Sequence, residues 1–262
     1  ILPPREKERL TRLLRERLLF VYPYLKDTLV PTKLSVSALK HSDEAEMGSG
    51  YAAILPPPSF AKEELIREGK AVYDSAARGT LTHKALQYLN LKALSDNLGE
   101  GVKEQLDNLT QEGRFTPGQR EAIYEGDIVR FLQSDIGKAL LNAEDIRRET
   151  EFIMALPPGE VQSEWEGATG KILIQGIIDL SFIYKGKRYI IDYKTDALTG
   201  RERFEANLRR YERQIRAYAL AYCGLYGAAA EELYICYLRT GTNVRVEGGL
   251  KGAFDGITEG IT

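Results

Sequence analysis

Apolar residues recur along the chain with helical spacing in some stretches and with strand-like spacing in others. Leucines in residues 5–19 share one helical face, with arginines and glutamates around the rest. The two spacings predict helical stretches at 5–19, 75–94 and roughly 117–142, strands at 149–156 and 176–194, a long helix at about 201–226 and a strand at 232–238. This order indicates an α/β or α+β fold, in which helices pack on a β-sheet.

The first 70 residues differ in pattern from the rest and predict an N-terminal extension. The leucine stripe of residues 5–19 needs another surface to cover it, and the consecutive prolines of LPPPS at 55–59 favour extended chain. We therefore expect a helix and linker region at 1–70, including a surface loop at 43–60, and the main domain at 71–262. Because the chain begins with Ile1 rather than Met, it is expected to be a piece of a longer polypeptide, with its first helix loosely held or contacting another molecule.

Composition limits the classes of protein to consider. With 43% hydrophobic and 28% charged residues, the 262-residue chain is typical of a soluble globular protein. A net charge of -2 gives no overall attraction to nucleic acid, so any DNA contact needs a local basic surface or a partner. Two distant cysteines, Cys223 and Cys236, cannot build a zinc ribbon or an iron-sulfur cluster from this chain alone. No apolar segment is long enough to span a membrane, and we expect a cytoplasmic protein without a membrane partner.

The most informative stretch is GIIDLSFIYKGKRYIIDYKTD at 176–196, which predicts two strands joined by a two-residue turn at Lys185 and Gly186. Counting back from that turn places Asp179 opposite Asp192, with Lys194 on the same face. The other face is expected to be wholly apolar, and it comprises Ile178, Leu180, Phe182, Tyr189, Ile191 and Tyr193.

Two carboxylates facing each other across a hairpin repel, so a positive charge is expected between them. Lys194 alone could supply that charge, which would make the group a structural ion-pair cluster. Alternatively, the carboxylates hold a hard divalent cation, Mg²⁺ or Mn²⁺, which activates water and stabilises charge on a phosphate. The pattern of the hairpin leaves both interpretations open, and a turn of another length would send one aspartate to the opposite face.

Motifs elsewhere in the chain extend the pattern to a known family. GIID followed by IIDYKTD resembles the core of the PD-(D/E)xK nuclease superfamily, with Ile178 in place of the proline. GTLTHKALQ at 79–87 resembles the histidine helix of RecB-type nucleases, and YERQIRAY at 211–218 resembles their Q-x-x-x-Y helix. KLSVSALK at 33–40 is most similar to the C-terminal nuclease domain of the AddA component of bacterial AddAB helicase-nucleases. The resemblance covers roughly residues 20–240 and implies an α/β fold with a restriction-endonuclease-like core, in which helices flank a central mixed β-sheet.

The resemblance implies roles for individual residues. Asp179 and Asp192 become metal ligands, joined by the backbone carbonyl of Tyr193 and by His83. Lys194 orients or deprotonates the attacking water, or stabilises the charged phosphate. Together Lys194, Asp179 and Asp192 form the catalytic set, with Mg²⁺ as the cofactor and Mn²⁺ as a substitute.

Other polar residues are expected around this set. The motif suggests that Gln214 and Tyr218, one helical turn apart, support the site or touch DNA. The sequence leaves open whether Glu149 or Glu151 joins the site. Arginines on the same helix are either phosphate contacts or a solvated face: Arg209, Arg210, Arg213 and Arg216.

The function implied is a Mg²⁺-dependent DNA exonuclease domain that cuts one strand during helicase-coupled processing of double-strand breaks. Its partners would be DNA, the missing helicase part of its own chain and a second, AddB-like subunit. No ATP site is expected here, because GATGK at 167–171 lacks a glycine at Trp165 and a Ser or Thr at Ile172. Two alternatives are a stand-alone Cas4-like or phage-type exonuclease and a catalytically degenerate DNA-binding or scaffold module.

Overall fold

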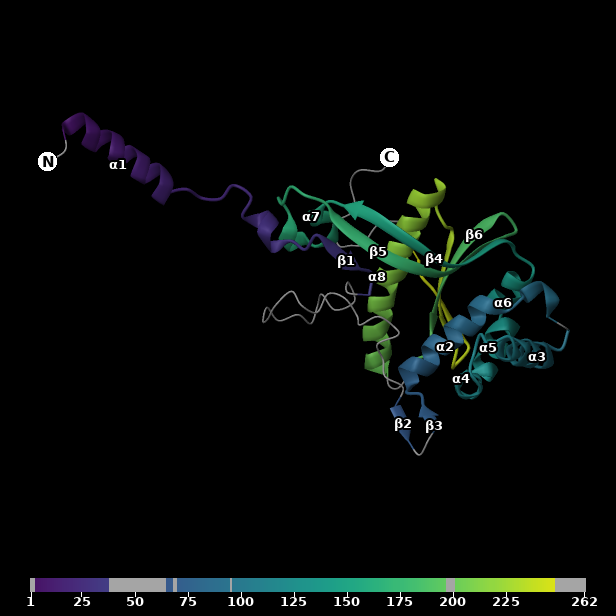
Figure 1. Ribbon diagram of the computed structural model, residues 1–262. Coiled ribbons are helices and arrows are strands. Elements are labelled where there is room, and N and C mark those ends of the chain that lie inside the picture. Colours follow the sequence, from purple (N-terminus) through teal and green to yellow (C-terminus); the bar gives the residue numbers. More distant parts are fainter. Residues whose placement is uncertain (1–2, 38–64, 68–69, 95, 197–200, 248–262) are drawn as a thin grey trace.

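A mixed six-stranded β-sheet forms the centre of the fold (Figure 1). The computed structural model describes residues 3–37, 65–67, 70–94, 96–196 and 201–247, so the loop expected at 43–60 lies outside the described residues. The strands of the sheet are β1 (Lys33–Ser35), β4 (Glu144–Leu156), β5 (Ile172–Tyr184), β6 (Lys187–Lys194), β7 (Glu232–Tyr237) and β8 (Thr242–Arg245). A separate small hairpin consists of β2 (Leu65–Arg67) and β3 (Lys70–Val72).

Helices lie on both faces of this sheet. Those of the main domain are α2 (Ser75–Tyr88), α3 (Leu98–Gln111), α4 (Pro117–Ala122), α5 (Glu125–Gln133), α6 (Asp135–Leu141), the short α7 (Pro158–Val161) and α8 (Arg201–Tyr226). One apolar cluster joins the sheet to residues of α2 to α6, and a second joins it to α8. The expected fold class, a mixed sheet flanked by helices, is confirmed.

Strand β5 organises the sheet because it has different neighbours along its length. Strand β4 pairs antiparallel with β5 on one edge. On the other edge, β1 pairs in parallel with residues 173–175 and β6 pairs antiparallel with residues 180–184. On that edge, residues 176–179 fall between the part of β5 that pairs with β1 and the part that pairs with β6.

The predicted hairpin turn is confirmed. Lys185 and Gly186 both have positive φ, 49° and 75°, as a type I′ turn requires. Tyr184 pairs with Lys187 and the register runs back to the pair of Leu180 with Ile191. The described ladder ends there, one position before Asp179 and Asp192.

The prediction of one wholly apolar face was wrong at Ile178. Leu180 and Phe182 pack with the helices α2 to α6, whereas Ile178 packs in the cluster that contains α8. The strand twists as it leaves its pairing with β6, so alternate residues no longer enter the same core. Asp179 lies between Ile178 and Leu180, at the point where the side chains of β5 change from one core to the other. A side chain at this point can reach the surface from the middle of the sheet.

The helical stretch expected at 117–142 consists of three short helices, α4, α5 and α6. Ser134 ends α5 and caps α6, because its hydroxyl accepts a hydrogen bond from the N–H of Gly137. A side chain at Gly137 would meet the backbone carbonyl of Phe131 at 2.1 Å, so only glycine permits this close crossing. Sequence periodicity detected the apolar face but not the breaks.

The first helix, α1 (Pro4–Leu18), projects away from the body (Figure 1), and none of its side chains is buried. This agrees with the expectation that the helix is not buried in the main domain, and whether it is loosely held or contacts another molecule stays a prediction. The chain joins the body near the 3-10 turn Lys26–Leu29, where the Asp27 carboxylate accepts hydrogen bonds from the Thr169 hydroxyl and N–H at 2.6 and 2.7 Å. Strand β1 then enters the main sheet, although it belongs to the predicted 1–70 region.

Two further expectations concern the burial of the cysteines and the presence of membrane-spanning helices. Cys236 is buried, as a small core residue should be, but Cys223 is partly exposed. Among the described residues, no helix is both long enough and apolar enough to cross a membrane.

Candidate active site

Helix α2 carries His83 to the end of β6 and depends on a glycine to do so. Asp74 caps the helix by accepting a hydrogen bond from the N–H of Ala77. A Cβ at Gly79 would lie 2.4 Å from the hydroxyl oxygen of Thr195, so the helix approaches β6 at this point more closely than a side chain allows. Buried Thr82 fixes the other side of α2 by accepting a hydrogen bond from the N–H of Tyr124. The GTLTH motif therefore lets α2 pack closely at the end of β6, and this packing orients His83.

Asp179 extends from β5 toward that histidine. Its Oδ2 lies 3.6 Å from the Nδ1 of His83 and accepts a 2.9 Å hydrogen bond from the backbone N–H of Tyr193. Three residues earlier, a Cβ at Gly176 would lie 2.7 Å from the ring of Phe152, so glycine lets β4 pack closely over this part of β5. The GIID motif thus combines a close approach with an inward carboxylate.

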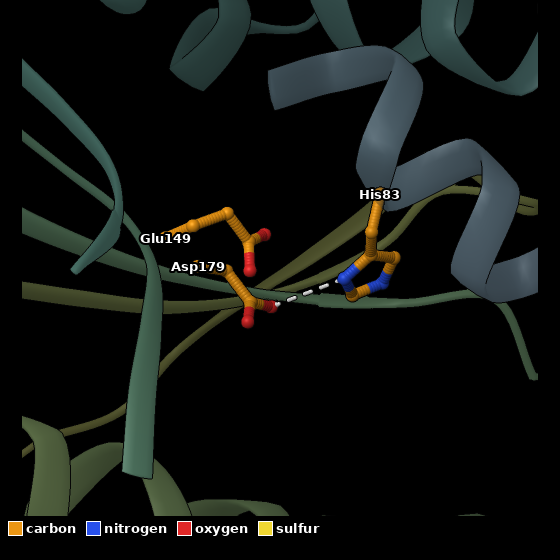
Figure 2. A group of neighbouring side chains, drawn as sticks. All are labelled: His83, Glu149 and Asp179. Carbon is orange, nitrogen blue, oxygen red and sulfur yellow. Dashed lines mark ion pairs between the residues drawn. The ribbon is translucent and has the colours of Figure 1, made fainter. Parts of the chain in front are cut away.

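Glu149 on β4 completes a group that the sequence left undecided. Figure 2 shows Glu149 and Asp179 side by side, with His83 reaching toward them from α2. Each residue offers one ligand atom, and these atoms all lie within 4.8 Å of one another. Burial, followed by the nearby charge of Asp179, raises the pKa of Glu149 to about 7. Glu149 also has φ of +49°, a left-handed conformation that is unfavourable for a non-glycine residue.

Asp192 and Lys194 form the other half of the site. The Lys194 Nζ lies 2.6 Å from Oδ2 of Asp192, whose side chain is fully buried. The same ammonium group donates to Oε1 of Gln214 at 3.1 Å, and Gln214 in turn donates to the hydroxyl of Tyr218 at 2.5 Å. Burial raises the pKa of Tyr218 well above its usual value, so its hydroxyl stays protonated. Gln214 and Tyr218 therefore support Lys194 from α8.

These groups open into two adjoining clefts. The larger, of about 1000 Å³, is lined by Asp179, Asp192 and Glu151 among others. The smaller, of about 490 Å³, extends past Lys84 and Tyr211. Four residues line both clefts: Thr80, His83, Glu149 and Lys194. Glu151 thus borders the larger cleft, but only Glu149 joins the three-ligand group.

The arginines of α8 have a different position. Arg209 is exposed and Arg210 and Arg213 are half-buried, and none of the three lines either cleft. Arg216 donates to the backbone carbonyl of Glu247 at 3.3 Å. A role for Arg210 and Arg213 in binding DNA stays a prediction, as does the metal-ligand role of the Tyr193 carbonyl.

The donor set fits a divalent cation. Carboxylate oxygens and an imidazole nitrogen converge from three different elements, β4, β5 and α2. The partial burial of Glu149 and Asp179 makes their mutual repulsion costly, and a bound cation would relieve it. The ion-pair interpretation describes the Asp192–Lys194 pair, but it does not account for the second carboxylate pair beside His83.

Comparison with known proteins agrees with the geometry. The family model of the PD-(D/E)XK nuclease superfamily matches residues 59–253. The chain belongs to that superfamily. This match includes both strands of the motif hairpin, the histidine helix and the whole of α8.

Curated relatives carry a more specific name, which describes them as the A component of an "ATP-dependent helicase/nuclease". The chain is similar to the one from Bacillus licheniformis at 37% identity over 79% of this chain and 17% of the relative. The one from Alkaliphilus metalliredigens is 32% identical over 84% of this chain and 18% of the relative. The chain therefore spans less than a fifth of the length of these relatives.

Two features of the site escaped sequence reasoning. Glu149 was one of two glutamates on an expected strand, and its left-handed backbone leaves no signature in the residue types. Tyr211 begins the YERQIRAY stretch, which suggested no role for it, yet its ring centroid lies 4.4 Å from the Lys194 ammonium nitrogen. A possible signal was its spacing of seven residues from Tyr218, which puts both on one helical face.

Proposed function

We propose that this chain is a metal-dependent DNA nuclease domain that hydrolyses phosphodiester bonds. The observation that supports it most strongly is the convergence of His83, Glu149 and Asp179 within 4.8 Å, in a cleft shared with the Asp192–Lys194 pair. Superfamily membership supports the same conclusion. The proposed cofactor is Mg²⁺, with Mn²⁺ as a substitute.

In the proposed mechanism, His83, Asp179 and Asp192 hold the cation, with Glu149 as an added carboxylate. The bound cation would lower the pKa of a water molecule and offset charge on the phosphate. Lys194 lies beside Asp192 at the junction of the two clefts, where its ammonium group can bind a phosphate oxygen or orient the nucleophile. Gln214 keeps that group in place.

The wider context of the reaction is part of the proposal. The relatives' name and the small share of their length that this chain spans support a nuclease module within a larger helicase-nuclease. In that setting the rest of the chain and a second polypeptide would deliver one DNA strand to the site during processing of broken ends. The division at residue 70 stays a prediction, and β1, from the N-terminal side of that division, pairs with β5 of the module.

The test is degradation of end-labelled single-stranded DNA by the purified chain with Mg²⁺, with Mn²⁺ and with a chelator. Asp179→Asn should abolish cutting, because it removes the charge of one ligand in the group formed with His83 and Glu149. Glu151→Gln, which alters a carboxylate in the same cleft but outside the ligand group, should cut normally. Metal binding by calorimetry without any cutting would favour the binding-module alternative, and failure to bind either metal would refute the proposed centre.

A further inference from the structure

In the part of the chain that the structure describes, the ammonium group of Lys194 contacts three groups. Two are the oxygens of Asp192 and Gln214, at 2.6 and 3.1 Å, and the third is the ring of Tyr211, whose centroid lies 4.4 Å away. A lysine has a flexible stem, so its neighbours decide where its charge lies. A cation over the face of a tyrosine ring is attracted by the electron-rich face, more strongly when water is largely excluded. Lys194 is only 9% exposed, which meets that condition.

The Tyr211 ring is itself held in position. Its hydroxyl donates a hydrogen bond to the carboxylate of Asp196, and its ring packs at an angle on Tyr237 with centroids 6.3 Å apart. Asp196 lies two residues beyond Lys194, which is the last residue of strand β6. The bond between Tyr211 and Asp196 thus ties α8 to the segment that carries Lys194.

We propose that Tyr211, held by Asp196, is a positioning residue that fixes the Lys194 ammonium group for phosphodiester hydrolysis. The proposal rests on the proposed nuclease function. A bound cation competes with Lys194 for the charge of Asp192, whereas Gln214 and Tyr211 offer contacts that do not depend on a carboxylate ligand. Tyr211 therefore keeps the Lys194 ammonium group in place when Asp192, the strongest partner of that group, also binds the cation.

The first test separates positioning from DNA binding by steady-state kinetics on single-stranded DNA. Tyr211→Leu removes the ring and should lower kcat about tenfold, a loss of the size expected for a desolvated cation–ring contact, with KM for DNA nearly unchanged. Tyr211→Phe keeps the ring and should retain most of kcat. Asp196→Asn, whose amide oxygen can still accept the hydrogen bond from the Tyr211 hydroxyl, should retain a higher kcat than Asp196→Ala.

Tyr226 offers a matched control on the same helix. The Arg147 guanidinium carbon lies 4.2 Å from the centroid of the Tyr226 ring, so this ring also contacts a cation. Tyr226 lines neither cleft. Tyr226→Leu should leave kcat and KM unchanged. A fall in kcat equal to that of Tyr211→Leu would show that losing any such contact damages the fold, and would overturn the specific role.

A second readout needs neither metal nor activity. The ¹⁵N–¹H signal of the Lys194 ammonium group, assigned by its loss in Lys194→Met, should show a ring-current shift in metal-free protein. Tyr211→Leu should remove that shift and Tyr211→Phe should keep it. An unshifted signal, or a Tyr211→Leu effect confined to KM, would overturn the proposal. If the wild-type protein does not cut DNA, the proposed function fails, while the spectrum still decides whether the ring positions Lys194.

Discussion

The ammonium nitrogen of Lys194 lies 2.6 Å from a carboxylate oxygen of fully buried Asp192. In the metal-free protein this lysine balances a charge that burial would otherwise destabilise. A metal ion would take over part of that role. Stability and metal binding are therefore linked through one carboxylate.

The first prediction follows from this link. Lys194→Met should destabilise the metal-free protein by about 3 kcal/mol, because a buried carboxylate loses the cation beside it. Mg²⁺ should stabilise the variant more than the wild type, since the ion supplies the missing charge. Urea unfolding with chelator and with Mg²⁺ measures both effects.

Lys138→Met is the matched control for that experiment. Lys138 lies 4.0 Å from Asp135, and both side chains are largely exposed. Such a pair contributes little, so the control should change stability by less than about 0.5 kcal/mol with or without Mg²⁺. An equal response of both variants to Mg²⁺ would argue against a metal at Asp192.

The second prediction concerns pH and Glu149. Its pKa rises from an ordinary 4.5 to about 7 in the fold, so between these values the folded protein keeps a proton that the unfolded chain has lost. Stability of the metal-free protein should therefore decrease as pH rises from about 4.5 to about 7. The carboxylate is only partly buried and solvent screens it, so the decrease should be on the order of 1 kcal/mol.

Thermal unfolding in chelator across this pH range measures the effect. Glu149→Gln should remove this part of the pH dependence, whereas Glu151→Gln should leave it intact. Metal binding below pH 7 should also release a proton from Glu149, which calorimetry in buffers of different ionisation enthalpy detects. Identical pH profiles for the wild type and Glu149→Gln would refute the assignment.

The third prediction tests how the fold aims His83. Gly79→Ala places a methyl group 2.4 Å from the Thr195 hydroxyl oxygen, so helix α2 must move or Thr195 must turn. Overpacking of this kind should destabilise the protein by about 1 kcal/mol and reduce DNA cutting. Adding Thr195→Ala removes that oxygen and should restore both.

Gly224→Ala provides the comparison. Gly224 lies in α8 and a Cβ there would meet nothing within 4 Å, so alanine should stabilise the helix by about 0.5–1 kcal/mol. Activity should not change. If the double variant at Gly79 and Thr195 is no better than Gly79→Ala alone, the close contact is not what limits the position of α2.

The fourth prediction concerns α1. Deletion of residues 1–19 should change the melting temperature by less than about 2 °C and leave cutting of short DNA unaltered, since no α1 side chain is buried. Asp27→Ala should have a larger effect, because it removes both bonds to Thr169. A strongly destabilised deletion variant would show that α1 packs on the main domain.

The sequence by itself determined several elements, above all the motif hairpin and the long helix, and most residues of the candidate site. Alternation along residues 176–194 and the Lys185–Gly186 turn specified the hairpin register, because side chains on a strand have a fixed period of two. The helix at 201–226 was predicted with the bounds that the structure shows, since its apolar stripe is long and regular. The motif residues His83, Asp179, Asp192, Lys194 and Gln214 all reach one cleft.

Tertiary structure decided what periodicity cannot express. Ile178 enters a different core from Leu180 because β5 twists where it exchanges β6 for β1 as its neighbour. Glu149 rather than Glu151 joins His83 and Asp179 because of a left-handed turn of the backbone at that residue. Tyr211 meets Lys194 because α8 crosses the end of β6. Local pattern sets which face a side chain occupies, but which residues from distant segments meet there depends on the twist and packing of the whole sheet.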